Sequence, residues 1–108
     1  DVQENLDISD VLKKKNVFAL TVNGDSMIDA CIADGDMVLM EPIKDSFSLR
    51  NGDIVSAMVP GLGTTLKYFF KRGTKIFLEA ANQSYEPIEL NLDEVVFQGK
   101  LLAVWRKI

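Results

Sequence analysis

The sequence contains a series of short apolar runs, most of them stopped within a few residues by glycine, proline or asparagine. The runs are rich in β-branched and aromatic residues, which β-strands favour. Turn-forming sequences separate them, notably Asn51-Gly52 and the Pro-Gly-Leu-Gly segment 60–63, and such spacing is typical of antiparallel strands. No long helical period interrupts the series. The pattern therefore predicts an all-β fold of compact antiparallel strands with little helix.

Seven runs are expected to form strands, and in chain order they are 17–23, 36–42, 53–59, 64–71, 75–81, 87–90 and 95–108. Gly99 interrupts the last run, and a glycine inside a strand often marks a bulge. Trp105, near the end of that run, is expected in the core because tryptophan is usually well buried. Before the first strand, segment 6–16 is expected to hold a short helical turn.

Composition excludes several classes of function. The 108 residues suit one compact domain, and no apolar run approaches the ~20 residues of a membrane helix. The acidic first residues are unlike a signal peptide. A net charge of −4 argues against a broad basic surface for nucleic acid. The single cysteine, Cys31, fits a cytoplasmic protein and is expected to be a small packing residue.

Catalysis by histidine is excluded because the chain contains none. With a single cysteine as well, a zinc site and the Ser-His and Cys-His pairs are ruled out. No acidic run has calcium-loop spacing, so neither a metal nor a cofactor is expected. Asp34 and Asp36 are expected to shape a turn, and Met27, Met37 and Met40 to fill the core.

Ser26 poses the chemical question in this sequence, because it follows Gly24 after a predicted strand and a serine hydroxyl needs a base to become nucleophilic. Lys67 could supply one. On an exposed strand edge it would simply discourage aggregation, but burial among apolar groups would lower the pKa of its amine. A neutral lysine beside a serine forms a workable Ser-Lys dyad. Spacing alone does not bring the two residues together.

Five sequence elements, in order, resemble the carboxy-terminal domain of the LexA repressor family. That family of self-cleaving serine peptidases also includes UmuD-type polymerase accessory proteins and many prophage repressors. The similarity extends from about Phe18 to the end of the chain. The matching elements are Gly24-x-Ser26-Met27, Asp34-Gly35-Asp36, Asn51-Gly52-Asp53, Thr65-x-Lys67 and the Asn-x-x-Tyr-x-Pro-Ile segment 82–88.

The resemblance implies roles for individual residues. Ser26 would attack a peptide bond in the protein's own upstream segment, with Lys67 as general base. The backbone N–H groups of Asp25 and Ser26 would form the oxyanion hole, and Met27 and Thr65 would line the substrate cleft.

The resemblance also implies partners and a cellular role. A homodimer is expected through the closing segment 101–108, together with cleavage stimulated by a RecA filament in the SOS response to DNA damage. Operator DNA would be bound by a separate amino-terminal domain.

Residues 1–108 are expected to form a single peptidase and dimerisation domain. The cleavable segment of such proteins commonly contains Ala-Gly or Cys-Gly, and neither dipeptide occurs here. The sequence is therefore interpreted as a fragment that lacks both the cleavage site and the DNA-binding domain, and that does not cleave itself.

Three alternatives share these motifs. A UmuD-like subunit of an error-prone polymerase would carry a short arm upstream instead of a DNA-binding domain. A prophage repressor would differ in its operator. A LexA-like regulator could also retain the fold chiefly as a non-cleaving dimerisation module, although Ser26 and Lys67 are both present.

Overall fold

The computed structural model describes residues 16–106, and it is all-β, as the sequence predicts. Its strands are β1 (Phe18–Thr21), β2 (Met37–Pro42), β3 (Ile54–Val59), β4 (Gly63–Arg72), β5 (Lys75–Glu79), β6 (Ile88–Asn91) and β7 (Val96–Trp105). The helical elements of this region are three single 3-10 turns: η1 (Ile28–Ala30), η2 (Ser46–Ser48) and η3 (Leu92–Glu94). None of its helices has the length and apolar character needed to cross a bilayer. The helical turn expected in segment 6–16 falls almost entirely outside the described residues.

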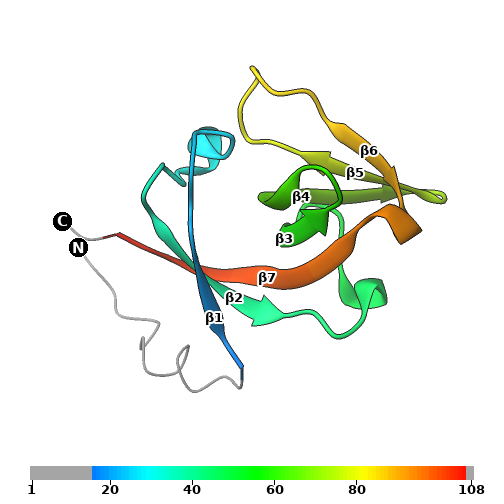
Figure 1. Cartoon of the computed structure of the whole chain (residues 1–108), viewed down its shortest axis with the longest axis horizontal. Helices are drawn as coiled ribbons and strands as arrows, with labels where there is room; N and C mark the ends of the chain where they lie inside the picture. The colour runs from blue at the N-terminus through cyan, green and yellow to red at the C-terminus, as the bar shows by residue number, and fades with distance from the viewer. Residues whose placement is uncertain (1–15, 107–108) are drawn as a thin grey trace, which may run out of the picture.

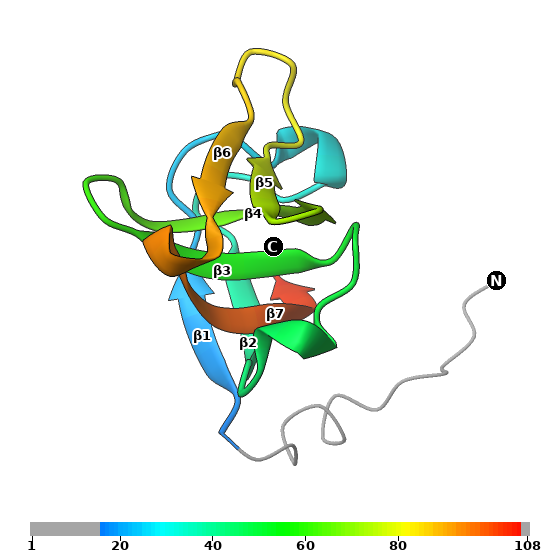
Figure 2. The ribbon, with the colours of Figure 1, turned by 90° about the vertical axis from the view of Figure 1, so that its right-hand side faces the viewer.

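All seven strands belong to one curled antiparallel sheet in the order β1-β2-β7-β3-β4-β5-β6. The last strand of the sequence, β7, therefore lies in the middle, between β2 and β3. Figure 1 shows β7 crossing the molecule between the β1–β2 hairpin and the β3–β6 meander. In Figure 2, turned by 90°, β1 and β2 stand below and β5 and β6 above β3. The curled sheet brings the end of β1 towards the start of β4, where the site described below lies.

The predicted irregularity at Gly99 is confirmed. The pairing of β3 with β7 shifts by one residue between Ser56 and Ala57, opposite Gly99 and Phe97. Gly99 is buried, and a Cβ atom built on it would lie 2.6 Å from Cζ of Phe18 and 2.9 Å from Cβ of Met40. Because real Cβ atoms do not approach so closely, only glycine lets β1 and β2 pack against β7 at this point.

The core consists of two clusters of buried residues. Around β3, β4 and β5 the buried residues of the first cluster are Val55, Ala57, Val59, Phe69, Ile76, Leu78, Leu90 and Val95. Near the serine turn the second cluster is built from Met27, Ile32, Val38, Met40 and Ala81. Burial of apolar surface is worth roughly 25 cal/mol per Å², so the second cluster, which contains Met27, holds the turn around Ser26 against the sheet.

Three sequence predictions about single residues are wrong. Trp105 is 50% exposed rather than in the core, because the end of β7 extends past the second cluster and pairs with exposed Met37. Met37 is therefore not core filler, whereas Met27 and Met40 are. Cys31 is exposed, since it ends η1 in the left-handed conformation with φ of 61°.

Candidate active site

The serine turn, residues 22–27, leaves the end of β1 and is fixed by the Asp34-Gly35-Asp36 turn. Val22 donates its N–H to the Asp36 carbonyl oxygen at 2.8 Å, and Gly35 returns a bond of 2.8 Å to the Val22 carbonyl oxygen. The Gly24 N–H donates to Oδ1 of Asp34 at 2.6 Å. Gly24 has φ of +91° and open space around its α-carbon. Its role is thus to adopt the left-handed backbone conformation that a side chain would disfavour.

Met27 anchors the serine turn to the interior. Its side chain is 1% exposed and belongs to the second core cluster. Its carbonyl oxygen accepts bonds from the N–H groups of Ala30 and Ile32, at 3.0 and 3.3 Å. Ser26 therefore lies between an exposed residue, Asp25, and a fully buried one. This arrangement restrains the backbone of Ser26 while leaving its hydroxyl at the surface of a cleft.

Lys67 projects from β4 and is buried, with 8% of the residue exposed. Its strand neighbour across the sheet is Val55, which is fully buried. The Nζ atom of Lys67 lies 3.1 Å from Oγ of Ser26 and 2.5 Å from Oγ1 of Thr65. The carbonyl oxygen of Leu66 is 3.2 Å away. Lys67 and Ser26, which are 41 positions apart in the sequence, are therefore in contact. Sequence spacing alone does not predict this contact.

The environment of Lys67 disfavours its charged form. Burial lowers the pKa of its amine below the ordinary 10.5, because desolvation penalises the charged state. The nearest groups are two hydroxyls and a carbonyl. A neutral amine has two N–H groups and one lone pair, which match these three partners. In the neutral form, the two N–H groups can be donated to Leu66 and Thr65, which leaves the lone pair facing the Ser26 hydroxyl. That is the arrangement in which an amine can take the serine proton.

A cleft of about 250 Å³ lies beside this pair. The end of β1 with residues 22–23 forms one part of its lining, and residues 64–66 of β4 form another. Ser26, Met27 and Val38 complete it. The lining is mixed, with apolar side chains from Leu20, Val38 and Leu66 and hydroxyls from Ser26 and Thr65.

The structure brings together the residues that the sequence singled out. Ser26, Met27 and Thr65 all line the cleft, and Lys67 bonds to two of them. Thr65 has a position that the sequence did not predict, since it accepts a bond from the lysine as well as lining the cleft. Among residues 16–106, the N–H groups of Asp25 and Ser26 have no hydrogen-bond acceptor. Both groups are therefore available to bind an oxyanion.

Two polar residues of the site carried no predicted role. Asn82 and Tyr85 both bond to Asp25 from the loop after β5. Their segment, 82–88, is one of the elements that resemble the family, but sequence spacing does not indicate what it contacts. Within residues 16–106 no three His, Cys, Asp or Glu side chains are grouped so as to hold a metal ion.

Comparisons with known proteins identify the family of the chain. A family model described as Peptidase S24-like matches residues 1–102. The chain is 38% identical over 104 residues to a LexA repressor of Koribacter versatilis, covering 96% of this chain and 48% of the relative. It is 33% identical over 103 residues to a transcription regulator LexA of Synechocystis, covering 95% of this chain and 51% of the relative. The chain thus spans about half the length of these relatives. Given the family match over nearly all of its residues, the chain belongs to the Peptidase S24-like family.

Proposed function

We propose that this chain is the self-cleaving and dimer-forming part of a LexA-like transcriptional repressor, inactivated by its own Ser-Lys peptidase chemistry. The observation that carries the proposal is the contact of 3.1 Å between the buried amine of Lys67 and the hydroxyl of Ser26. The names of the two relatives support a repressor over a polymerase subunit. Control of an SOS regulon, stimulation by a RecA filament and binding of operator DNA through another domain are part of the same proposal.

The proposed reaction is acyl transfer. Neutral Lys67 accepts the hydroxyl proton as Oγ of Ser26 attacks the peptide carbonyl carbon. The resulting oxyanion is stabilised by the backbone N–H groups of Asp25 and Ser26. Protonated Lys67 then gives the proton to the leaving nitrogen, and the C–N bond breaks. Water, deprotonated by Lys67, hydrolyses the ester and restores Ser26.

The edges of the sheet favour an extended peptide as the substrate. In the described sheet β1 pairs only with β2, so its other edge is open. The first half of β4 pairs with β3, whereas β5 joins β4 only from Tyr68 onward. Both open edges contribute residues to the cleft. An extended segment between them would gain main-chain hydrogen bonds on either side, and its scissile carbonyl would lie beside Ser26.

A test uses the parent protein with its natural upstream segment. Incubation at raised pH, where more Lys67 is neutral, should yield two fragments, and a RecA filament should produce them at neutral pH. Ser26→Ala and Lys67→Ala should each abolish cleavage. Lys71→Ala provides a matched control, because Lys71 is an exposed lysine on the same strand.

Two results would contradict the proposal. One is a parent that stays intact both at raised pH and with the RecA filament. The other is cleavage that persists in Ser26→Ala. If the upstream segment proves to be a short arm rather than a DNA-binding domain, the UmuD-like alternative is favoured.

A further inference from the structure

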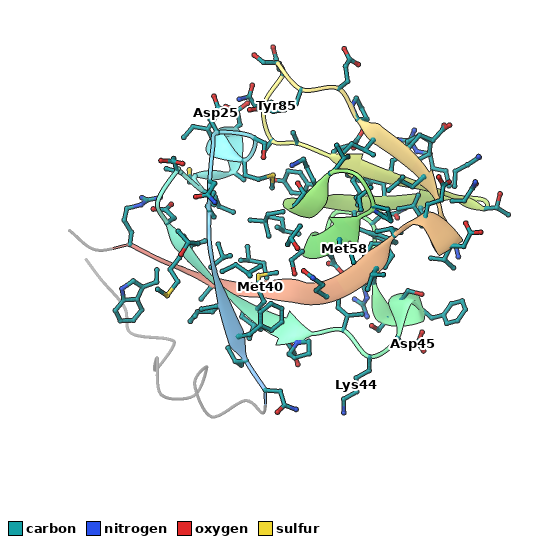
Figure 3. All side chains as sticks on the ribbon, in the orientation of Figure 1. Asp25, Met40, Lys44, Asp45, Met58 and Tyr85 are labelled. Atoms are coloured by element: carbon teal, nitrogen blue, oxygen red, sulfur yellow. The ribbon has the colours of Figure 1, made fainter. Side chains whose placement is uncertain are left out.

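The residue before Ser26 is held by a loop from a distant part of the sequence. Nδ2 of Asn82 donates to the backbone carbonyl oxygen of Asp25 at 3.0 Å. The hydroxyl of Tyr85 donates to Oδ1 of the same residue at 2.5 Å. The N–H of Asp29 donates to the carbonyl oxygen of Ala81 at 2.8 Å. Figure 3 shows Asp25 and Tyr85 side by side at the top of the molecule. Segment 81–85 thus bonds twice to Asp25 in the serine turn and once to Asp29 in η1.

The bond from Asn82 fixes one particular peptide plane. The carbonyl of Asp25 and the N–H of Ser26 belong to the same planar trans peptide, in which the two groups point in opposite directions. The carbonyl oxygen also accepts from the N–H of Ile28 at 3.2 Å, so both of its lone pairs are used. When the carbonyl oxygen of Asp25 is held on one side of the peptide, the N–H of Ser26 must therefore point to the opposite side. That N–H is one of the two donors available for an oxyanion.

Asn82 is itself oriented by its loop. Its Oδ1 accepts the N–H of Ser84 at 2.9 Å, which leaves Nδ2 as the end that faces Asp25. The backbone N–H of Tyr85 also bonds to the carbonyl oxygen of Asn82, at 3.2 Å. Tyr85 in turn keeps its proton, because its bond to the Asp25 carboxylate raises the pKa of the phenol above the ordinary 10.0. Both groups therefore remain donors when the pH is raised.

We propose that Asn82, with support from Tyr85, is a positioning residue for the peptidase reaction: it orients the Asp25–Ser26 peptide and so aims the Ser26 N–H at the developing oxyanion. This inference rests on the proposed function, since it concerns the same nucleophile. Neither residue touches the reacting atoms. Both bonds are solvent-exposed, and exposed hydrogen bonds add little net stability. Their loss should therefore reduce reactivity much more than it reduces folding.

The test measures the reactivity of Ser26 in the chain itself, without a peptide substrate. Diisopropyl fluorophosphate is the probe: Oγ of Ser26 bonds to phosphorus, fluoride leaves, and Lys67 takes the hydroxyl proton. The phosphoryl oxygen needs the same N–H donors as a peptide oxyanion. Labelling rates are read by intact mass over a range of pH, and peptide mapping assigns the label to Ser26.

Asn82→Asp is the sharpest variant. It keeps the size of the side chain and an oxygen for the Ser84 N–H, but it cannot donate to the Asp25 carbonyl. We expect the plateau rate at high pH to fall roughly 10- to 100-fold, the effect of a misplaced reactive group. The pH midpoint should stay unchanged, because the neighbours of Lys67 are intact. Tyr85→Phe, which removes a single hydroxyl, should give a smaller fall of the same kind.

Gln83→Ala is the matched control, since Gln83 is an exposed residue of the same loop. It should label at the wild-type rate, and thermal unfolding should show that all variants fold. If Ser26 is labelled in the wild type, and Asn82→Asp and Tyr85→Phe show the same plateau rate as the wild type, this inference is overturned while the proposed function stands. A shifted pH midpoint of the labelling rate in these variants would also overturn the inference, because the loop would then affect the pKa of Lys67 and not the oxyanion donors. A wild-type Ser26 that is unreactive at every pH would overturn the proposed function together with this inference.

Discussion

Arg106 joins the end of the last strand to Asp36 by a two-point ion pair across 70 positions of sequence. Its Nε lies 2.8 Å from Oδ1 of Asp36, and its Nη2 lies 2.6 Å from Oδ2. Nη2 also donates to the carbonyl oxygen of Cys31 at 2.9 Å. Asp36 is 4% exposed and accepts the Ala33 N–H as well. The turn that supports Ser26 is thus tied to β7 by charge as well as by backbone pairing.

Because of this ion pair, the carboxylate of Asp36 should stay ionised at a lower pH than an ordinary aspartate. The bonds from Arg106, and then the Ala33 N–H, lower the pKa of Asp36 from 3.8 to about 2. A lowered pKa contributes stability that is fully present above the unfolded value of 3.8 and is lost as the pH falls through about 2. Arg106→Gln should raise the pKa of Asp36, as followed by NMR titration of its carboxyl carbon. Lys100→Gln, which removes a different ion pair, with Asp53, should leave it unchanged. An unaltered Asp36 titration in Arg106→Gln would show that Arg106 is not the cause.

A methyl group at Gly99 should destabilise the fold. Its Cβ would overlap Phe18 and Met40, at 2.6 and 2.9 Å. Overpacking of this kind costs typically about 1–3 kcal/mol, measurable as a lower urea midpoint for Gly99→Ala. Phe18→Leu makes room at the same place. The cost of Gly99→Ala should therefore be smaller in the Phe18→Leu background, and equal costs in both backgrounds would rule out the contact with Phe18 as the cause.

The strands were predictable because their signals are local. Turn residues such as Asn51-Gly52 and a bulge-forming Gly99 specify backbone conformation without reference to the rest of the chain. The position of Trp105 was not predictable in this way. Its exposure depends on how far β7 extends past the second core cluster, and that length is set by pairing with β2.

For the site as well, the sequence predicts which residues matter but not how they come into contact. The absence of histidine makes a lysine the most plausible base for Ser26, and the resemblance to the family points to Lys67. Their contact depends on the curl of a sheet in which β1 and β4 are not neighbours, and no periodicity encodes that curl. The bonds from Asn82 and Tyr85 to Asp25 were missed for the same reason, since they join residues 57 and 60 positions apart. The catalytic roles of Ser26 and Lys67 stay predictions.

The proposed dimer makes a prediction about the end of β7. Val104 and Trp105 are exposed there, and Met37 on β2 lies opposite Trp105. An exposed apolar strand end is a surface for association. The protein should sediment as a dimer at micromolar concentrations, and Trp105→Asp should sediment as a monomer. Phe47→Asp, which adds the same charge at another exposed aromatic residue, should stay dimeric. A monomeric wild type, or a dimeric Trp105→Asp, would contradict this surface.

The lowered pKa of Lys67 makes a prediction about stability that does not depend on any substrate. Folding lowers the pKa below 10.5, so between the folded value and 10.5 the unfolded chain binds more protons than the native one. The free energy of unfolding therefore rises with pH across that window. Below the folded pKa, Lys67 is protonated in both the folded and the unfolded state. Its contribution to the free energy of unfolding is then independent of pH and destabilises the fold most.

Lys67→Met removes the titrating group while keeping a long side chain. The stability of wild type relative to Lys67→Met should increase from neutral pH towards pH 10.5, in total by about 1.4 kcal/mol for each unit by which the pKa is lowered. Urea unfolding of both proteins at several pH values measures the difference. Lys71→Met, on the same strand but exposed, retains Lys67 and should follow the wild-type profile. A difference between wild type and Lys67→Met that stays constant with pH would mean that Lys67 is charged in the folded protein, and it would then be unable to act as the base for Ser26.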